Sequence, residues 1–453
     1  MPTATARPIA AVILAAGKGT RMKSGLHKVL HPLGGRPMLM HLLASLDGLA
    51  PARRVVVVGD RAEQLREALA GTDVVLAVQA PQLGTGHAVL QAEAALAGFS
   101  GTVLILFGDV PLISADTMGR LAAAVEPTDG PAIAVLGFRP AVPGAYGRVI
   151  AGAAGRILKM VEAKDASPQE LAVPLCNAGL MAVRSEHLVP LLKQMGNANA
   201  AGEYYLPDIV MLAAQQGLHA VVLEGSTDEL VGVNSRGELA QAEALFQARR
   251  RAELMAAGVT LIAPETVFLS WDTEISSDTI IEPNCVFGPG VRMGHDVRIR
   301  AFSHLEGAEV ADGCEVGPYA RLRPGTQLGQ GAKVGNFVET KKAVLGAGAK
   351  ANHLSYIGDA VVGAKANIGA GTITCNYDGF NKHLTHIGAG AFIGSNSALV
   401  APVAVGDGAI VGAGSVITSD VAGDALAVTR APQEQKAGWA ARFRAAALAR
   451  KGK

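Results

Sequence analysis

A glycine-rich segment directly follows the first strongly apolar run of the chain. The run from Ile9 to Ala16 leads into Gly17-Lys18-Gly19-Thr20-Arg21-Met22, and Lys28 follows six residues later. Glycines after a strand let backbone N–H groups approach an anion closely, and the cations Arg21 and Lys28 add charge. The segment is not a Walker A loop, and a dinucleotide fingerprint needs a glycine where Met22 stands. A loop that binds nucleotide phosphates is therefore favoured over a plain turn.

A second polar group surrounds Gln79, at the end of a further apolar run. Gln79 is followed by Leu83-Gly84-Thr85-Gly86-His87, which opens a helical pattern. A glutamine beside a Gly-Thr turn can read a base edge through hydrogen bonds, and ordinary capping of the helix explains the same residues equally well. The sequence leaves these two interpretations level. His87 is expected to be structural or exposed, because nothing nearby needs a base.

Phe107-Gly108-Asp109 ends another apolar run. A carboxylate at the end of a central strand can hold Mg²⁺ against phosphates. The alternative is an aspartate that caps the next turn, since Pro111 follows, but the phosphate loop at a neighbouring strand end favours the metal. Polar or glycine positions also end later apolar runs, as a sugar pocket requires, although turns explain each one taken singly: Tyr146-Gly147-Arg148, Glu162, Asn177-Ala178-Gly179 and Val231-Gly232-Val233-Asn234.

Basic residues form one polar group in the second half of the chain. Arg321 and Arg323 precede the segment Glu339-Thr340-Lys341-Lys342. Cations that lie on adjacent turns of a repetitive fold can grip a phosphate. Ordinary surface charge is accepted as the explanation for Arg321 and Lys342, which leaves Arg323 and Lys341 as the candidates.

His353 is the candidate base of this half. A histidine can take a proton from an amine near neutral pH. A lone histidine is more often structural, but Tyr356, Asn367 and the cation pair are expected to converge on this one. A polar excursion over residues 374–386 carries Asn376-Tyr377, and such loops tend to carry function.

The elements that position the first group alternate between strands and helices, which argues for an α/β sheet covered on both faces. Strands are predicted over Ile9–Ala15, Arg54–Val58, Val74–Val78, Thr102–Phe107 and Ala132–Phe138, and helices over Pro37–Asp47, Ala62–Ala70, Gly86–Ala97 and Ser114–Val125. Ligands of such sheets lie outside the carboxyl ends of the strands, where the polar residues occur.

The second half repeats itself. From about Ile281 to Ile417 an apolar residue recurs every six residues, often followed by glycine. A sustained six-residue period is typical of a parallel β-helix, because no single coil can bury its apolar residue without a neighbour. Residues 235–258 show helical spacing and are predicted to be a linker helix between a domain over 1–234 and a β-helix domain over 259–430. The tail, 431–453, is basic, and its segment Gln433 to Arg450 is predicted to be helical.

Composition limits the classes of function. The chain has 453 residues, a net charge of +1 and four cysteines with no Cys-x-x-Cys pair. This length predicts two or three domains, and the near-neutral charge gives no argument for nucleic-acid or membrane partners. The apolar run at Ile9 is too short for a membrane span. The scattered cysteines indicate reduced thiols in a cytosolic protein.

The Leu-Ala-Ala-Gly-x-Gly-Thr-Arg-Met opening with the spaced Lys28 resembles the sugar-1-phosphate nucleotidylyltransferases. Together with the hexapeptide region, nearly the whole chain resembles the family of bifunctional bacterial N-acetylglucosamine-1-phosphate uridylyltransferase/glucosamine-1-phosphate acetyltransferases. The resemblance implies a Rossmann-like nucleotidyltransferase domain followed by a left-handed β-helix, assembled as a homotrimer. It also implies a cytoplasmic enzyme that supplies UDP-N-acetylglucosamine for the cell envelope.

By this resemblance, the first domain transfers uridylyl from UTP to N-acetylglucosamine-1-phosphate with Mg²⁺ and releases pyrophosphate. Asp109 and Asn234 are then the Mg²⁺ ligands, and Phe107 stands where the family often has tyrosine, beside Gly108. The residues expected to bind nucleotide and sugar phosphate are Leu14, Ala15, Ala16, Gly17, Arg21, Lys28, Gln79, Gly84, Thr85, Phe107, Gly108, Asp109, Gly147, Glu162, Asn177 and Asn234.

The same resemblance makes the second domain an acetyltransferase. His353 is then the general base that frees the amine of glucosamine-1-phosphate to attack the thioester of acetyl-CoA. The sugar phosphate is expected to contact Arg323, Lys341, Tyr356 and Asn367, and acetyl-CoA is expected to contact Ala370, Asn376, Tyr377, Ser395, Ala413 and Arg430.

Two other interpretations stay open at this point. In one, the chain is a single-function nucleotidylyltransferase whose β-helix only assembles or regulates it. In the other, the repeat is a non-catalytic rod that binds proteins. His353 with Tyr356, Asn367 and the Asn376-Tyr377 excursion argue against the first, because a passive scaffold does not need them. The second is tested by whether the chain consumes UTP with N-acetylglucosamine-1-phosphate and Mg²⁺.

Overall fold

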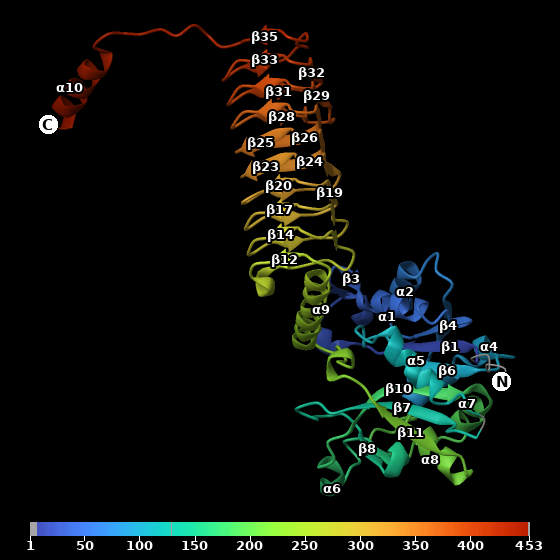
Figure 1. Ribbon diagram of the computed structural model, residues 1–453. Coiled ribbons are helices and arrows are strands. Elements are labelled where there is room, and N and C mark those ends of the chain that lie inside the picture. Colours follow the sequence, from blue (N-terminus) through green and yellow to red (C-terminus); the bar gives the residue numbers. More distant parts are fainter. Residues whose placement is uncertain (1–6, 128, 452–453) are drawn as a thin grey trace. The chain divides into compact units, whose positions relative to one another are not determined.

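In a computed structural model, the chain divides into two compact units, residues 1–249 and 250–453. The structure describes residues 7–127 and 129–451. Both units are drawn in Figure 1, and each is described by itself. The division falls inside helix α9 (Arg236–Ala256), in the region where the sequence predicts a linker helix.

The first unit is built on a mixed sheet with the strand order β11-β7-β10-β6-β1-β4-β5. The strand β1 (Ile9–Ala15) lies between β4 (Arg53–Val58) and β6 (Thr102–Phe107), and the three run parallel. The strand β10 (Cys176–Arg184) runs antiparallel to β6 and β7, and its first residue also pairs with β8. The remaining strands are β5 (Val75–Val78), β7 (Ile133–Phe138), β8 (Arg148–Ala151), β9 (Ile157–Val161), β11 (Ala220–Glu224) and the short pair β2 (Pro32–Leu33) and β3 (Arg36–Pro37).

Helices cover both faces of this sheet, because alternate residues of a strand point to opposite faces. Val12 and Leu14 of β1 pack in the cluster that holds helices α3, α7 and α8, whereas Ala11 and Ile13 pack in the cluster that holds α1, α2 and α5. The helices are α1 (Met38–Asp47), α2 (Ala62–Ala68), α3 (Thr85–Leu90), α4 (Glu93–Leu96), α5 (Ala115–Ala123), α6 (Pro168–Leu171), α7 (Ser185–Leu192) and α8 (Asp208–Gln215).

One predicted element is wrong as a continuous helix. The segment 86–97 is divided into α3 and α4, with Gln91 and Ala92 between them. Neither glycine nor proline marks this break in the sequence. At the break, Gln91 N donates to Ala88 O at 3.1 Å and Ala92 N donates to Val89 O at 3.0 Å, so the hydrogen bonds tighten to a spacing of three residues while both residues keep right-handed helical backbone angles.

The second unit is a left-handed parallel β-helix of stacked coils, visible as the ladder of short arrows in Figure 1. One row of strands is β12 (Thr260–Leu261), β14 (Ile280–Ile281), β17 (Arg298–Ile299), β20 (Glu315–Val316), β23 (Lys333–Asn336), β25 (Lys350–His353), β27 (Asn367–Ile368), β30 (Phe392–Ile393), β33 (Ile410–Val411) and β35 (Leu426–Ala427). Register runs straight through this row, so equivalent positions stack coil on coil.

Two further rows complete the coils. The second row is β15 (Val286–Phe287), β18 (His304–Leu305), β21 (Arg321–Leu322), β24 (Glu339–Leu345), β26 (Tyr356–Val362), β28 (Ile373–Cys375), β31 (Ala398–Val400) and β34 (Val416–Ile417). The third row is β13 (Glu274–Ile275), β16 (Arg292–Met293), β19 (Ala308–Val310), β22 (Thr326–Leu328), β29 (Thr385–Ile387) and β32 (Val403–Val405), joined by the far ends of β24 and β26.

The predicted hexad residues form the core of these coils. Ile281, Leu305, Val316 and Leu345 are fully buried, and the other openers pack with them in one continuous cluster. Each coil therefore buries its apolar residue against the next coil, as the six-residue period predicts. The tail contains helix α10 (Trp439–Lys451), which begins later than predicted and has no buried residue.

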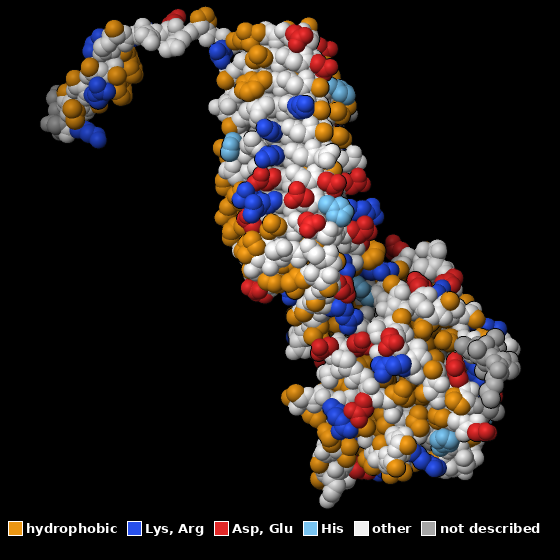
Figure 2. Space-filling model, viewed as in Figure 1, with side chains coloured by type: hydrophobic (Ala, Val, Ile, Leu, Met, Phe, Trp, Pro, Cys, Tyr) orange, Lys and Arg blue, Asp and Glu red, His pale blue; other side chains and the backbone are white. Residues whose placement is uncertain are grey.

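Charged side chains gather on the outside of the solenoid. Acidic and basic groups mingle over the middle coils in the view of Figure 2. On the row of β17, β20 and β23, Arg300 pairs with Glu315, and Lys333 lies 3.3 Å from the same carboxylate. Among the helices that the structure describes, none combines the length and the apolar character needed to cross a bilayer.

Candidate active sites

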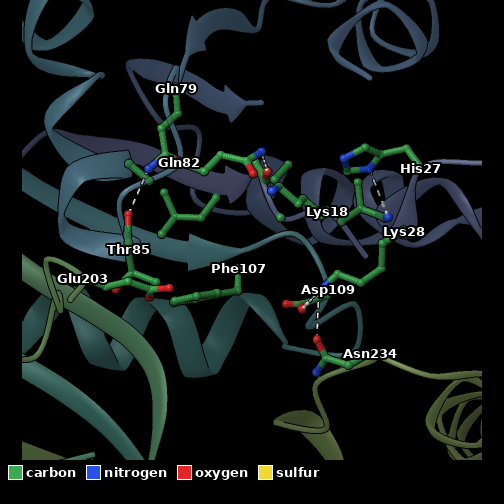
Figure 3. A pocket seen from close by; sticks show the side chains of 17 residues that line it. Lys18, His27, Lys28, Gln79, Gln82, Thr85, Phe107, Asp109, Glu203 and Asn234 are labelled. Carbon is green, nitrogen blue, oxygen red and sulfur yellow. Dashed lines mark hydrogen bonds and ion pairs between the residues drawn. The ribbon is translucent and has the colours of Figure 1, made fainter. Parts of the chain in front are cut away.

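A cavity of about 490 Å³ opens at the carboxyl ends of β1, β5 and β6 in the first unit. Its walls come from segments far apart in the sequence, and the labelled side chains in Figure 3 point toward a common space. The lining residues are Leu14, Ala15, Ala16, Gly17, Lys18, His27, Lys28, Val29, Gln79, Gln82, Gly84, Thr85, Ala88, Phe107, Asp109, Glu203 and Asn234.

The glycine-rich loop is shaped by close packing on Lys28. Gly19 has a φ of +60°, and a Cβ built there lies 2.9 Å from Cβ of Lys28. Only glycine tolerates both the left-handed backbone and this approach. The loop therefore lies directly against the residue whose ammonium reaches the end of β6.

The Lys28 ammonium lies between two oxygen ligands. Its Nζ contacts the carboxylate of Asp109 and lies 2.9 Å from Oδ1 of Asn234, as the dashed lines of Figure 3 show. The backbone fixes both partners: Val233 N donates to Asp109 O at 2.9 Å, and Asn234 N donates to Glu238 at 2.8 Å. The two oxygens thus already hold one cation between them.

This pair of oxygens fits a magnesium ion. Mg²⁺ prefers oxygen ligands and is usually held by one or two protein groups together with water and substrate phosphates. A carboxylate and an amide oxygen that share an ammonium have the donor atoms and the negative charge for such a site. Within residues 7–127 and 129–451, no group of three or more His, Cys, Asp or Glu residues could form a metal cage by itself.

A second cavity, of about 550 Å³, adjoins the first. Both are lined by Thr85, Phe107, Asp109 and Asn234, so the candidate metal ligands lie where the two meet. The other residues of the second cavity are Arg21, Val110, Val142, Gly144, Ala145, Tyr146, Gly147, Glu162, Asn177, Ala178, Gly179, Leu206, Pro207, Leu230, Gly232 and Glu238.

Glu162 and Asn177 give this second cavity its polar character. Burial raises the pKa of Glu162, and the nearby Asp208 and Asp165 raise it further. Asn177 is 8% exposed, and its Oδ1 accepts from Gly179 N at 2.9 Å. Gly179 has a φ of +85°, and a Cβ built there would lie 2.9 Å from the ring of Phe107. The absence of a side chain at Gly179 therefore leaves room for this ring in the cavity wall.

The predicted nucleotide and sugar residues line one cavity or the other, with one exception. Gly108 lines neither, because it lies beneath the wall and its N–H donates to Leu14 O at 3.0 Å. Sequence reasoning missed Gln82 and Glu203, which also line the first cavity. Gln82 was signalled by its place in the Gln79–Thr85 segment, whereas Glu203 carried no local signal.

On the β-helix, His353 is exposed at the end of β25, and Nδ1 lies 2.7 Å from Oδ1 of Asn336, one coil earlier. An amide oxygen can only accept, so Nδ1 carries a hydrogen, and in the neutral ring Nε2 then keeps its lone pair. The side chain does not point into the coil. No described residue among Tyr356, Asn367 and Lys341 forms a hydrogen bond with it.

His353 belongs to a column of equivalent positions. Register places Asn336 opposite His353, and two residues past the paired positions 351, 368, 393 and 411 lie His353, Ala370, Ser395 and Ala413. Arg430 donates to Ala413 O at the end of this column. The corner therefore unites the predicted base with four of the predicted acetyl-CoA residues.

The predicted anion ligands gather elsewhere on the same coils. Arg323 donates to Glu339 at 2.8 Å, and Lys341 pairs in register with Gly358. The Lys382 ammonium beside it, with Arg323 further away, lowers the pKa of Lys341. The hydroxyl of Tyr356 lies over Gly358, next to Lys341. Asn367, in contrast, begins β27 on the first row.

The excursion after β28 supplies the residue that sequence reasoning missed here, Lys382. The amide of Asn376 is 6% exposed and donates to Asp359, whereas the Tyr377 ring is 59% exposed. An isolated bridge joins Tyr377 to Lys382, so the loop folds back as a hairpin and brings this lysine to Lys341. A basic residue on the returning side of a polar excursion was the available signal.

Comparisons with known proteins agree with this division of the chain. The MobA-like NTP transferase domain matches residues 11–166, and the bacterial transferase hexapeptide model of six repeats matches residues 384–419. The bifunctional protein GlmU of Rhizorhabdus wittichii is 65% identical over 442 residues, 98% of either chain. The same protein of Sphingopyxis alaskensis is 62% identical over 96% of either chain. That of Maricaulis maris is 60% identical over 99% of this chain and 98% of its own.

The fold and the two sites define a transferase in which an NTP transferase domain is joined to a hexapeptide transferase domain. With 65% identity over 98% of its length, the chain belongs to the family of the bifunctional protein GlmU. The resemblance inferred from the motifs is thereby confirmed. The interpretations of the repeat as a mere scaffold or rod lose their basis, because the relatives that match 96–98% of the chain are named as bifunctional proteins.

Proposed function

We propose that the first unit transfers a uridylyl group from UTP to N-acetylglucosamine-1-phosphate. A phosphate oxygen of the sugar phosphate attacks the α-phosphorus, and the bond to the β-phosphate breaks to release pyrophosphate. The observation that carries the proposal is the pair of adjoining cavities, which share Thr85, Phe107, Asp109 and Asn234. A nucleotide in one cavity and a sugar phosphate in the other meet at the Asp109 carboxylate.

This chemistry depends on positioning and charge neutralisation. The nucleotide would be bound by Leu14 to Gly17, Gln79, Gly84 and Thr85. Its phosphates would be neutralised by Arg21 and Lys28. Gly147, Glu162 and Asn177 would hold the acetylated sugar. Asp109 and Asn234 would hold Mg²⁺, which when bound offsets the charge that develops on the phosphates.

We further propose that the β-helix transfers an acetyl group from acetyl-CoA to glucosamine-1-phosphate. The amine attacks the thioester carbonyl, its proton passes to His353, and the thiol of coenzyme A leaves with a proton. Nε2 of His353 is the accepting atom, because Nδ1 donates to Asn336. The sugar phosphate would be bound by Arg323, Lys341, Tyr356 and Asn367. Lys382 joins this group through its contact with Lys341. Acetyl-CoA would run along Ala370, Ser395, Ala413 and Arg430 and meet Asn376-Tyr377.

A trimer is proposed as the working form of this second site. The hexapeptide repeat suggests oligomerisation. Within one chain, Gly358, which lies beside the cations, follows His353 by five residues and lies past a corner of the coil. Each extended residue spans about 3.3 Å, so the cations and the base of one chain are held apart. Neighbouring solenoids that face one another would bring the cations of one chain to the histidine of the next.

The proposal extends to the setting of the enzyme. A cytoplasmic location fits UTP and acetyl-CoA as co-substrates and the free cysteines Cys176, Cys285, Cys314 and Cys375. Small molecules are the proposed partners, besides further copies of the chain. The proposed domain limits stay at 1–234, 235–258, 259–430 and 431–453, and UDP-N-acetylglucosamine is the proposed product for cell-envelope synthesis.

A product assay on the intact chain tests both reactions. With glucosamine-1-phosphate, acetyl-CoA, UTP and Mg²⁺, the expected products are coenzyme A, pyrophosphate and UDP-N-acetylglucosamine. His353→Ala should abolish the release of coenzyme A and leave pyrophosphate release from N-acetylglucosamine-1-phosphate unchanged. Acetylation that survives in the variant would refute the role of His353, and a wild-type chain without either product would refute the proposed function.

A further inference from the structure

The side-chain amide of Gln79 is held in one orientation. Gln79 is 5% exposed and lines the first cavity. Its Nε2 donates to Gly84 O at 2.9 Å and lies 3.1 Å from Nδ1 of His87. Because an amide nitrogen carries two hydrogens, these two acceptors use both. Oε1 accepts no hydrogen bond from any described residue, so it is the polar atom of this side chain that is left for a ligand.

His87 must act as an acceptor toward Gln79. Nδ1 faces the amide of Gln79, and Nε2 lies 3.2 Å from the amide nitrogen of Gln91. A neutral imidazole has one acceptor nitrogen, so only one of these contacts is a hydrogen bond. Nε2 of Gln91 already donates to His87 O at 3.0 Å, and because this side chain is partly exposed its second hydrogen can bond to water. The amide of Gln79 is buried, and beyond the Gly84 carbonyl its second hydrogen has only Nδ1 to bond to. Nδ1 is therefore the acceptor.

Both acceptors belong to one rigid turn. Tyr204 N donates to Leu83 O at 2.8 Å, and Gly86 N donates to Tyr204 O at 2.9 Å. Leu206 N donates to Oγ1 of Thr85 at 3.0 Å. These hydrogen bonds from the segment 204–206 hold the turn that contains Gly84 and the first residues of α3, which include His87. Reversing the Gln79 amide would bring its oxygen against a carbonyl oxygen and a nitrogen lone pair, which repel it.

We propose that His87 locks the amide of Gln79 with its oxygen toward the base, and that this lock makes the nucleotide site select uracil over cytosine. The inference rests on the proposed uridylyl transfer. The N3 atom of uracil carries a hydrogen that Oε1 can accept, whereas N3 of cytosine carries a lone pair. A site built around a fixed acceptor rejects the ligand that cannot donate to it. His87 is a positioning residue here, because it acts through Gln79.

The test compares UTP with CTP in the intact chain with N-acetylglucosamine-1-phosphate and Mg²⁺. His87→Phe keeps the ring beside Tyr204 and removes both nitrogens. The ratio of kcat/KM for UTP to that for CTP should fall about tenfold, the value of one net hydrogen bond. His87→Asn, whose Oδ1 can take the place of Nδ1, should restore most of the ratio. Gln91→Ala is the matched control, because it removes the other neighbour of the ring, and should leave the ratio unchanged.

The outcomes separate this proposal from the proposed function. A wild-type ratio that persists within about twofold in His87→Phe overturns the lock, provided that the variant keeps its thermal transition. Should His87→Phe fail to fold, His87→Leu serves as the second variant. Calorimetric binding of UTP and CTP tests the lock without turnover. If the wild-type chain releases no pyrophosphate, uridylyl transfer fails, and a tenfold loss of binding preference in the variant still supports the lock. Equal wild-type binding of both nucleotides overturns it.

Discussion

At the scale of single residues, Lys28 shows how the first site is arranged before any ligand arrives. Its ammonium contacts the Asp109 carboxylate and the Asn234 amide oxygen, and its stem packs against Gly19 of the glycine-rich loop. One residue thus links the loop at the end of β1 to the two oxygens proposed as metal ligands. The positive charge of Lys28 therefore lies where the phosphates of the proposed nucleotide are expected to bind.

Lys28→Ala should lower pyrophosphate release by about a hundredfold or more, because removing one preorganised group that stabilises developing charge costs that much. The measurement is steady-state turnover of UTP with N-acetylglucosamine-1-phosphate. Lys23→Ala is the matched control, since this lysine is exposed and lies near the same loop. Equal activity of the two variants would remove Lys28 from the mechanism. Acetyl transfer should be unchanged in both.

Glu162 should make the stability of the chain depend on pH. Burial and the neighbouring carboxylates raise its pKa above the ordinary value of 4.5. The folded chain then binds a proton more tightly than the unfolded chain, so stability is lost as pH rises from that value through the raised pKa. Glu162→Gln should therefore raise Tm at neutral pH, and this gain should shrink as the pH falls toward 4.5.

Glu170 provides a control of opposite sign. Lys159 and the backbone N–H of Ser167 lower its pKa to about 2, so its contribution to stability is present above the ordinary value and is lost at lower pH. Glu170→Gln should lower Tm at neutral pH. The same sign for both variants would show that these shifts do not govern stability.

At the scale of elements, the strands near the glycine-rich loop were predictable because their apolar runs are nearly unbroken. β1 and β6 have the predicted bounds, and β4 and β7 differ by one residue at the start. The break between α3 and α4 was not predictable, because it is a local change in hydrogen-bond spacing at Gln91 and Ala92 that neither glycine nor proline marks. The antiparallel placement of β10 also needed tertiary information, because the hydrophobic pattern of a strand does not show whether it pairs parallel or antiparallel with its neighbours.

The turn before α3 depends on a glycine. Gly84 has a φ of +111°, and a Cβ there would meet the backbone O and N of Tyr204 at 2.7 and 2.8 Å. Gly84→Ala should therefore destabilise the first unit by about 1–3 kcal/mol for the backbone, because a φ of 111° with a ψ of 175° is open to glycine alone. The forced shift of the 203–206 segment should cost a further 1–3 kcal/mol or so. Denaturant unfolding measures this loss, and UTP binding should weaken with it.

Gly71→Ala is the matched control for this turn. Gly71 has a φ of +81°, but a Cβ there has no neighbour within 4 Å. Only the backbone cost of about 1 kcal/mol is expected. If the two variants lose equal stability, the close approach to Tyr204 carries no weight.

At the scale of the whole molecule, the six-residue period predicted the second fold, because stacking is its physical cause. The placement of the second site was less accessible to sequence. His353 and the cations around Lys341 are close in the chain, yet no hydrogen bond joins them within the described residues, and they occupy different parts of the coil. Sequence shows which residues are polar, whereas the direction in which each corner faces appears only in three dimensions.

Mixing of variants tests whether chains complete one another. His353→Ala and Lys341→Ala should each abolish acetyl transfer in a pure trimer. In mixed trimers from co-expression, some interfaces would join an intact histidine from one chain to an intact lysine from the next, so a fraction of the activity should return. Light scattering should give three chains per particle. A mixed trimer as inactive as its parents would place the site within one chain.

Because the register along the His353 corner is straight, the distance between two positions on it is set by the number of coils between them. From His353 through Ala370, Ser395 and Ala413 to the last coil, each step adds the spacing of neighbouring strands, about 4.8 Å. Any molecule that touches both ends must therefore be long, and its length is counted in whole coils. Removing one complete coil between these ends would shorten the reach by a single step while every remaining side chain kept a stacked partner.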